Sequence, residues 1–466
     1  MNKSLKRFVI ILLLIPIVVS AEPEKKDDNK EITFIGITNI TGDTNEKDST
    51  YSSIIGSQNA ILVSGGTSKL ENPLITKSGE ANGEEADFYG TNAAVLVYNN
   101  ATLDIVNGEI NTDGEYSNAL FAYGEGVINV SGTIINTTSN HSGGLMVTGG
   151  GMITASNCTV NTSGNSSAAI RSDRGGGTLI VNGGTYETSG KGSPAVYSTA
   201  NIIVNNATLT STSAEGLVIE GANSIVLNNV KLTDTNNTLN GNSETYKNIF
   251  LYQSMSGDAE EGISYFNAKD SSIITNKGDT IFVTNTISDI TLENNEIVNT
   301  DGDFLRIEAG KWGNANENGG HVTLNLFNQQ VDGDIIVDNI SDLSLNMNKK
   351  SILTGSINNK NEANKISIKL SSDSILSLTG DTYINLLENE QEDNSNIYSN
   401  GKYKLFVNGE EVNINSSKYN FSELIDDINE DIISRENNNK NNLYYIIGGS
   451  VLLLVVFIIV KIKRND

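Results

Sequence analysis

Three charged residues lie close together in the middle of the chain, and two of them are arginines, which bind acidic ligands. Arg171, Asp173 and Arg174 form the densest group of charges in the repeated part of the sequence. An arginine can hold a carboxylate or a sulfate through two parallel hydrogen bonds, so this group would suit a uronate or a sulfated sugar. The alternative is a local arginine–aspartate pair that holds the glycine run 175–177 in place.

A second group combines an aromatic ring with charges. Arg306, Glu308, Lys311 and Trp312 lie just before and within a glycine-rich insert. Aromatic rings stack on sugar rings while charged and amide groups hydrogen-bond to hydroxyls, which gives a polar site with apolar walls. We therefore predict a ligand-binding face that comprises Arg171, Asp173, Arg174, Tyr197, Glu220, Arg306, Glu308, Lys311 and Trp312.

Catalytic chemistry has less support in the sequence. The two histidines, His141 and His321, each lie next to a glycine in an expected loop. Asp173 and Glu220 lie two repeats apart, near the carboxylate spacing of about 5–10 Å that a glycosidase requires. No catalytic triad, phosphate loop or zinc spacing is recognisable. We predict no catalytic residue, and a polysaccharide lyase or glycoside hydrolase stays open.

An acidic insert at 256–262 is the one candidate for a metal site. It contains Asp258, Glu260 and Glu261, and calcium prefers several carboxylate oxygens. A solvated acidic loop explains the same residues. We therefore predict no cofactor, with calcium left open.

The elements that position these residues come from a repeat. Hydrophobic segments such as 93–98 and 118–123 recur, at first every 25 residues and later every 21 to 33. Alternation with a period of two, β-branched residues and no amphipathic helical stretch indicate short strands. A repeat of this length is one coil of a solenoid, so we predict an all-β parallel β-helix of about a dozen coils.

Alternation along the first strand of each coil assigns its residues to two faces. The expected inward column is Val95, Leu120, Leu145, Ile170, Val196, Leu217, Phe250, Phe282 and Leu305. One outward column is then Leu96, Phe121, Met146, Arg171, Tyr197, Val218, Leu251, Val283 and Arg306, and a second is Tyr98, Tyr123, Thr148, Asp173, Thr199, Glu220, Gln253, Asn285 and Glu308. This outward face carries too many apolar side chains to be fully exposed to solvent. We therefore expect it either to be a binding surface or to be covered by inserts.

Asparagine and glycine recur at the corner between the second and third strands, for example at Asn107, Asn157 and Asn206. Both residue types tolerate positive φ, and stacked asparagines can hydrogen-bond along the stack. The single cysteine, Cys158, falls in a column of small residues. This predicts a buried packing role and excludes an intrachain disulfide.

Several runs of the repeat resemble one bacterial family. They are 143–151 (GGLMVTGGG), 166–177 (SSAAIRSDRGGG), 192–199 (GSPAVYST), 252–259 (YQSMSGDA) and 311–314 (KWGN). The runs are similar to exported proteins described as carbohydrate-binding-domain or adhesin-like, with a pectate-lyase-like fold. The resemblance extends from about Asn59 to Ile384. It implies a right-handed solenoid and a carbohydrate ligand.

The two ends of the chain carry segments typical of an exported, membrane-anchored protein. Basic residues, an apolar run and the small residues at 19–21 predict a signal peptide. The 17-residue apolar run from Tyr444 to Val460, followed by basic residues, predicts one membrane helix with its tail in the cytoplasm. The expected organisation is a signal peptide at 1–21, an acidic polar leader at 22–50, the β-helix at 51–384, a C-terminal cap and tether at 385–442, a transmembrane helix at 443–460 and a cytoplasmic tail at 461–466. A strand at 32–37, a hairpin within 402–414 and a short helix within 421–433 would close the two ends of the stack.

The charge is strongly negative, with 31 basic and 56 acidic residues. Six basic residues and one acidic residue belong to the terminal segments, so the part between them carries a net charge of about −30. Nucleic acid is a poor partner for such a surface. We expect a cell-surface, single-pass protein with an extracellular ectodomain that binds a polysaccharide, a host glycan or another surface protein. A structural or protein-binding rod is the further alternative.

Overall fold

The computed structural model describes residues 32–239 and 244–420. The expected signal peptide, the helix within 421–433 and the membrane segment lie outside these residues. Within the described ranges, no helix combines the length and hydrophobicity needed to cross a bilayer.

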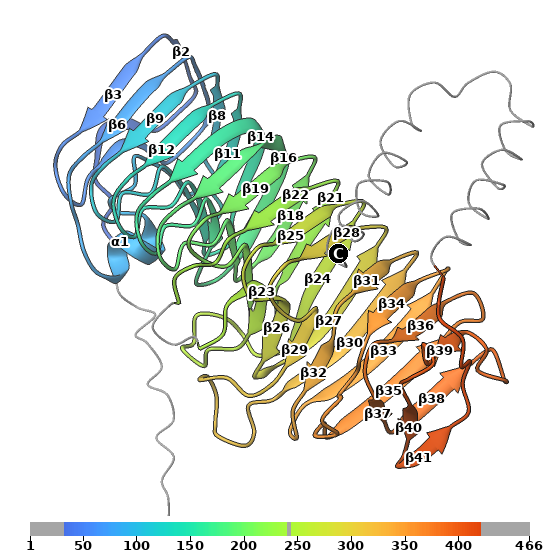
Figure 1. Ribbon diagram of the computed structural model, residues 1–466. Coiled ribbons are helices and arrows are strands. Elements are labelled where there is room, and N and C mark those ends of the chain that lie inside the picture. The colour runs from blue at the N-terminus through green and yellow to red at the C-terminus, as the bar shows by residue number, and fades with distance from the viewer. Residues whose placement is uncertain (1–31, 240–243, 421–466) are drawn as a thin grey trace, which may run out of the picture.

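Parallel strands stack into a solenoid of about 15 turns, which confirms the predicted parallel β-helix and is a few turns longer than expected. Figure 1 shows the rod, from β2 and β3 at its N-terminal end to β40 and β41 at the other. β1 and β2 already pair with the next coil, so the ladder begins within the segment expected as a leader. The strand expected at 32–37 begins later in the chain, as β1 at Gly36–Ile40, and residues 32–35 are not part of it.

One wall of the solenoid is a parallel sheet of 12 strands, called sheet A below. Its strands are β1 (Gly36–Ile40), β4 (Asn59–Val63), β7 (Val95–Val97), β10 (Leu120–Tyr123), β13 (Leu145–Thr148), β15 (Ile170–Ser172), β17 (Val196–Ser198), β20 (Leu217–Glu220), β23 (Lys247–Tyr252), β26 (Asp279–Thr284), β29 (Leu305–Ile307) and β32 (Ile335–Val337).

Two further ladders form a sheet of 22 strands, called sheet B. The first contains β2 (Thr44–Lys47), β5 (Thr67–Glu71), β8 (Thr102–Val106), β11 (Val127–Ser131), β14 (Gly151–Thr162), β16 (Gly177–Thr188), β18 (Asn201–Asn205), β21 (Ser224–Asn228), β24 (Ile263–Lys269), β27 (Thr286–Glu293), β30 (Gly320–Phe327), β33 (Asp342–Asn348), β35 (Lys365–Leu370) and β38 (Leu386–Asn389). The second contains β3 (Thr50–Ser53), β6 (Leu74–Lys77), β9 (Glu109–Thr112), β12 (Ile134–Thr137), β19 (Thr208–Ser211), β22 (Lys231–Asp234), β25 (Ser272–Thr275) and β28 (Glu296–Asn299). β14 and β16 pass through both ladders without a break.

Two small sheets complete the C-terminal end. One contains β31 (Gln330–Asp332), β34 (Ile352–Gly355), β36 (Ile375–Leu378) and β39 (Ile397–Tyr398), and the other β37 (Thr382–Ile384), β40 (Leu405–Val407) and β41 (Glu410–Val412). β40 and β41 pair antiparallel, which confirms the predicted terminal hairpin. A short helix, α1 (Glu84–Tyr89), lies in an insert between β6 and β7 where the sequence predicted no helix.

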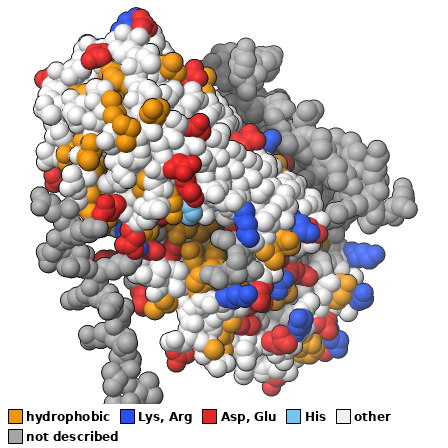
Figure 2. Space-filling view, turned by 90° about the vertical axis from the view of Figure 1, so that its left-hand side faces the viewer, with side chains coloured by type: hydrophobic (Ala, Val, Ile, Leu, Met, Phe, Trp, Pro, Cys, Tyr) orange, Lys and Arg blue, Asp and Glu red, His pale blue; other side chains and the backbone are white. Residues whose placement is uncertain are grey.

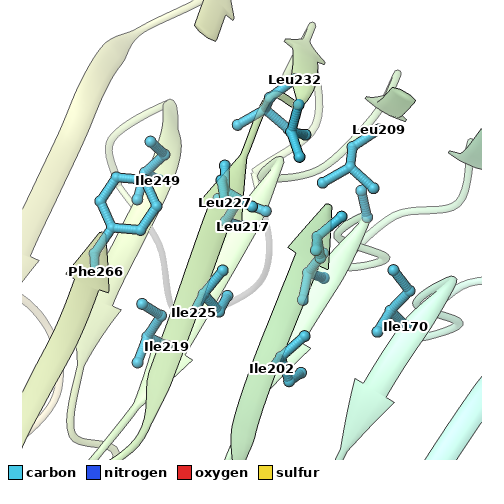
Figure 3. Close-up of a cluster of buried hydrophobic side chains, with 14 of the residues drawn as sticks. Ile170, Ile202, Leu209, Leu217, Ile219, Ile225, Leu227, Leu232, Ile249 and Phe266 are labelled. Carbon is cyan, nitrogen blue, oxygen red and sulfur yellow. The ribbon is translucent and has the colours of Figure 1, made fainter. Parts of the chain in front are cut away.

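The core is the space between these sheets. Inward side chains from successive coils lie on one another; Figure 3 shows Ile202, Ile225 and Phe266 among them, and all three are fully buried. The stacking follows from the register, which pairs Ile202 with Ile225 and Ile225 with Phe266. Cys158 is buried, as predicted, and its burial raises the pKa of its thiol.

The corner between the two ladders of sheet B has the predicted asparagines. Asn107, Asn157 and Asn206 have φ of 54°, 51° and 54°. The Asn229 side chain donates to Oδ1 of Asn206 at 2.8 Å. The positive φ of these residues allows the turn that each coil must make, and the hydrogen bond joins two successive coils.

Candidate functional site

The predicted site residues lie on the outer face of sheet A and in the loops that follow its strands. Arg171 pairs with Tyr197 in the ladder, and Phe282 pairs with Arg306 further along. These residues belong to a single outward column. The sheet therefore carries both predicted groups on one face, as expected.

The predicted columns are wrong in two coils. Ile249 and Ile281 stand in the inward column, while Phe250 and Phe282 point outward. Tyr252 and Thr284 likewise occupy the second outward column in place of the predicted Gln253 and Asn285. In both strands several apolar residues follow one another, so alternation does not distinguish the two faces.

The N-terminal part of this face is covered by the insert that contains α1. Leu96, Phe121 and Met146 are fully buried although they point away from the core. Gly90, at the end of α1, has φ of 71°, and a Cβ atom there would lie 2.5 Å from the Phe121 ring. Thr148 Oγ1 donates to the Phe88 carbonyl at 2.7 Å. The insert is thus fitted closely onto the sheet.

Arg171 is held between two carboxylates. Its guanidinium lies 2.9 Å from Asp87 Oδ1 and 2.6 Å from Asp173 Oδ2, and its side chain is 12% exposed. Burial raises the pKa of Asp173, against the opposing effect of Arg171. The carboxylates raise the pKa of Arg171, although burial acts to lower it. Arg171 and Asp173 form a local pair, the alternative to ligand binding, and Asp87 of α1 joins them.

Arg174 connects two inserts that cover the face. Its Nε atom donates to Asp258 Oδ1 at 2.6 Å, and its guanidinium lies 3.4 Å from Glu84. The same guanidinium lies 3.6 Å from the centre of the Phe88 ring. Asp258 therefore pairs with an arginine. No group of three or more His, Cys, Asp or Glu residues suited to a metal ion occurs in the described ranges.

Glu220 is 2% exposed and lies in a group of hydroxyls. It accepts hydrogen bonds from Tyr197, from Ser254 and, at 2.9 Å, from Tyr252. Burial raises the pKa values of Tyr197 and Tyr252 well above their usual range, so both remain donors. Asp173 and Glu220, the pair considered for glycosidase chemistry, are thus both buried and both hydrogen-bonded within the protein.

An aromatic cluster joins the two predicted groups. Trp312 lies 5.4 Å from Phe250 and 4.9 Å from Tyr252, ring centre to ring centre. Phe250 and Tyr252 stack at 4.5 Å, and Tyr197 packs against the same cluster. Arg171 on β15 and Arg306 on β29 are five strands apart in sheet A, and the bulky side chains between them make the two groups one continuous band.

An open groove lies at the second group, and we call it the Arg306 groove. It has a volume of about 550 Å³, and its lining includes Tyr246, Asp301, Asp303, Arg306 and Glu308. Unlike the Arg171 network, it is open to solvent, because Asp301 and Glu308 have side chains that are 48% and 30% exposed.

Three carboxylates hold Arg306 in this groove. Its Nε donates to Asp279 Oδ2 at 2.6 Å, and its other nitrogens contact Asp303 and, at 3.4 Å, Glu308. Burial raises the pKa values of Asp303 and Glu308, and Arg306 opposes it. The groove therefore presents an oriented guanidinium surrounded by hydrogen-bond acceptors.

The remaining candidates lie beside the groove or on the surface. Lys311 pairs with Glu244, one of the groove residues, at 3.0 Å. His141 stacks on Tyr116 with ring centres 4.5 Å apart, and His321 lies 2.9 Å from Asp342. His141 therefore packs on an aromatic ring, and His321 is paired with a carboxylate.

The sequence did not place several residues of the band there: Glu84, Asp87, Tyr252 and Asp279, and also Asp258, which it assigned to a possible calcium site. Alternation with the correct register would have identified Tyr252. The four acidic residues have no local signal, because their partners lie 27 to 90 positions away along the chain.

Figure 2 shows acidic side chains over the whole of one side of the molecule, while lysine and arginine gather mainly over its lower half.

Comparison of the sequence with protein-family models and with curated proteins finds no match.

Proposed function

We propose that the protein is a non-catalytic binding protein that holds a polysaccharide or glycan in the Arg306 groove. The observation that carries the proposal is the oriented Arg306 guanidinium in an open groove beside Tyr246 and several carboxylates. Carboxylates and the guanidinium match sugar hydroxyls, and a tyrosine ring supplies an apolar face. The chain also resembles carbohydrate-binding or adhesin-like proteins, and this supports the same ligand class.

The terminal segments support display at the cell surface. A signal peptide at 1–21 and a membrane helix at 443–460 would export the solenoid and anchor it with the groove outside the cell. Many anchored copies would make weak individual contacts effective through multivalency. Adhesion to a glycan-coated surface is the role that these features favour.

The test is a glycan array probed with the full-length chain, with and without calcium, followed by incubation with any glycan that binds. The expected result is binding without product. Tyr246→Ala and Asp301→Asn should weaken it about tenfold, since each removes a groove contact, whereas Glu71→Gln, on distant β5, should leave it unchanged. Product formation would instead establish a lyase or hydrolase. Equal binding by all variants would overturn the assignment of the groove.

A structural or protein-contacting rod is the second candidate. It is favoured by the inserts that bury Leu96, Phe121 and Met146 on the outer face of sheet A. A covered face contributes to stiffness and leaves less surface for a ligand. The absence of binding to any glycan on the array would favour this candidate.

A further inference from the structure

A second groove is lined in part by the insert that carries Trp312. It has a volume of about 620 Å³, and Met255, Ile287, Glu261, Glu317 and His321 are among its lining residues. The groove does not contain the Arg306 site. Its chemistry differs as well, because exposed aliphatic side chains replace the tyrosine and the arginine.

The sheet next to this groove inverts the usual pattern of the solenoid. β24 and β27 extend sheet B beyond the start of β21, and their added residues pair Ile263 with Ile287 and Ser264 with Ser288. Both serines point inward and are buried, whereas both isoleucines point outward. Elsewhere in the core the inward residues are mainly aliphatic.

Together these side chains form an exposed apolar surface, which we call the isoleucine platform. Its members are Met255, Ile263, Tyr265 and Ile287, which are 54%, 40%, 43% and 52% exposed. A chain that buries serine and exposes isoleucine at the same coils breaks the local rule for a stable sheet, and such departures are expected at functional sites. Covering the platform would remove apolar area from water.

The charges around the platform select its partner. Glu261 and Glu317 line the groove, and Asp289 on β27 is the ladder partner of Tyr265 on β24. Among the residues described, none of these three carboxylates forms an ion pair with a lysine or arginine. A second copy of this chain would bring the same acidic rim onto itself, and each copy carries a net charge of −25. The rim therefore suits a basic partner.

We propose that the isoleucine platform binds an extended basic segment of another protein, with apolar side chains on the isoleucines and lysines or arginines on the rim. Aliphatic side chains offer no directional contact to sugar hydroxyls, which favours a peptide over a glycan here. An extended segment directs alternate residues onto one surface, so its apolar side chains can cover the isoleucines, while the long, flexible basic side chains between them reach outward to the carboxylates of the rim. This site is independent of the Arg306 groove and of its ligand.

The probe is a fluorescent peptide of alternating lysine and valine, titrated against the full-length chain at low and at moderate salt. We expect saturable binding that weakens as salt rises. Two matched peptides separate the contributions: glutamate with valine reverses the charge, and lysine with serine removes the apolar side chains. Both should bind at least tenfold more weakly than the first peptide.

Variants then place the site. The double substitution Ile263→Thr and Ile287→Thr keeps β-branched residues in the strands and should weaken binding at least tenfold. Ile134→Thr is the control, because Ile134 is 48% exposed on β12, at distant coils of the same sheet. Glu261→Gln with Glu317→Gln should reduce the salt dependence. Equal binding of the lysine–serine peptide, or undiminished binding by the double threonine variant, would overturn the proposal.

Discussion

Arg174 donates to Asp258 at 2.6 Å although the two residues are 84 positions apart. The pair joins a glycine-rich turn after β15 to the insert between β23 and β24. Both side chains are less than one quarter exposed. Together with the hydrogen bond from Ser254 to Glu220, this pair fastens the 253–262 insert, which contributes Met255 and Glu261 to the lining of the second groove.

Arg174→Gln should loosen that insert without unfolding the solenoid. Loss of a partly buried, charge-assisted hydrogen bond typically costs about 1–2 kcal/mol, or roughly a fivefold to thirtyfold increase in local opening. Hydrogen exchange of residues 253–262 measures this. Lys47→Gln, which breaks the exposed pair with Glu71, is the control and should change nothing there. Unchanged exchange in Arg174→Gln would show that other contacts hold the insert.

Arg171→Ala should destabilise the whole fold. It leaves Asp87 and Asp173 as unpaired carboxylates under the α1 insert, and removal of one partner from a buried ion network costs about 3–5 kcal/mol. Urea denaturation measures the loss. Adding Asp87→Asn and Asp173→Asn to Arg171→Met should recover a large part of it, since no charge is then buried. An Arg171→Ala protein of native stability would contradict the packing role and return Arg171 to ligand binding.

Asp234→Asn should stabilise the protein at neutral pH. Asp234 is fully buried, and burial raises its pKa to about 9. The usual value near 3.9 applies to the unfolded chain, so between about pH 4 and pH 9 the folded state binds a proton that the unfolded state has lost. The free energy of unfolding therefore falls as the pH rises through this window.

We expect Asp234→Asn to raise the free energy of unfolding by about 1–3 kcal/mol at pH 7 and to flatten its pH dependence. Urea denaturation at a series of pH values is the measurement. The exposed Glu125→Gln serves as the control. A variant with the wild-type slope between pH 5 and pH 9 would contradict the prediction.

Glycan binding in the Arg306 groove should weaken as the pH is lowered. Asp303 and Glu308 accept hydroxyl hydrogen bonds best when ionised, and burial raises both pKa values. The loss should therefore begin at a higher pH than ordinary carboxylates, with pKa values of about 4, would give. Trp312, the only tryptophan, directly follows Lys311, which pairs with the groove residue Glu244, and supplies a fluorescence signal for the titration. An affinity that stays constant from pH 7 to pH 4 would rule out these carboxylates as ligand contacts.

The sequence alone determined the parallel β-helix, its asparagine corners, the buried cysteine and the terminal hairpin. These features depend on neighbours in the chain or on the repeat, so alternation and residue type carry them. The strand with Ile170 and Arg171 shows this well, because an apolar residue next to a charged one leaves one choice of face.

The tertiary structure decided what happens outside the core. Ile249 and Phe250 are both apolar, so only stacking on Leu217 and Val218 selects which of them points inward. Arg171 and Arg174 look alike in the sequence, yet Asp87, which joins Arg171, and Asp258 and Glu84, which pair with Arg174, come from inserts 84 or more residues away. Such contacts depend on where an insert folds back onto the sheet, and no local pattern records that.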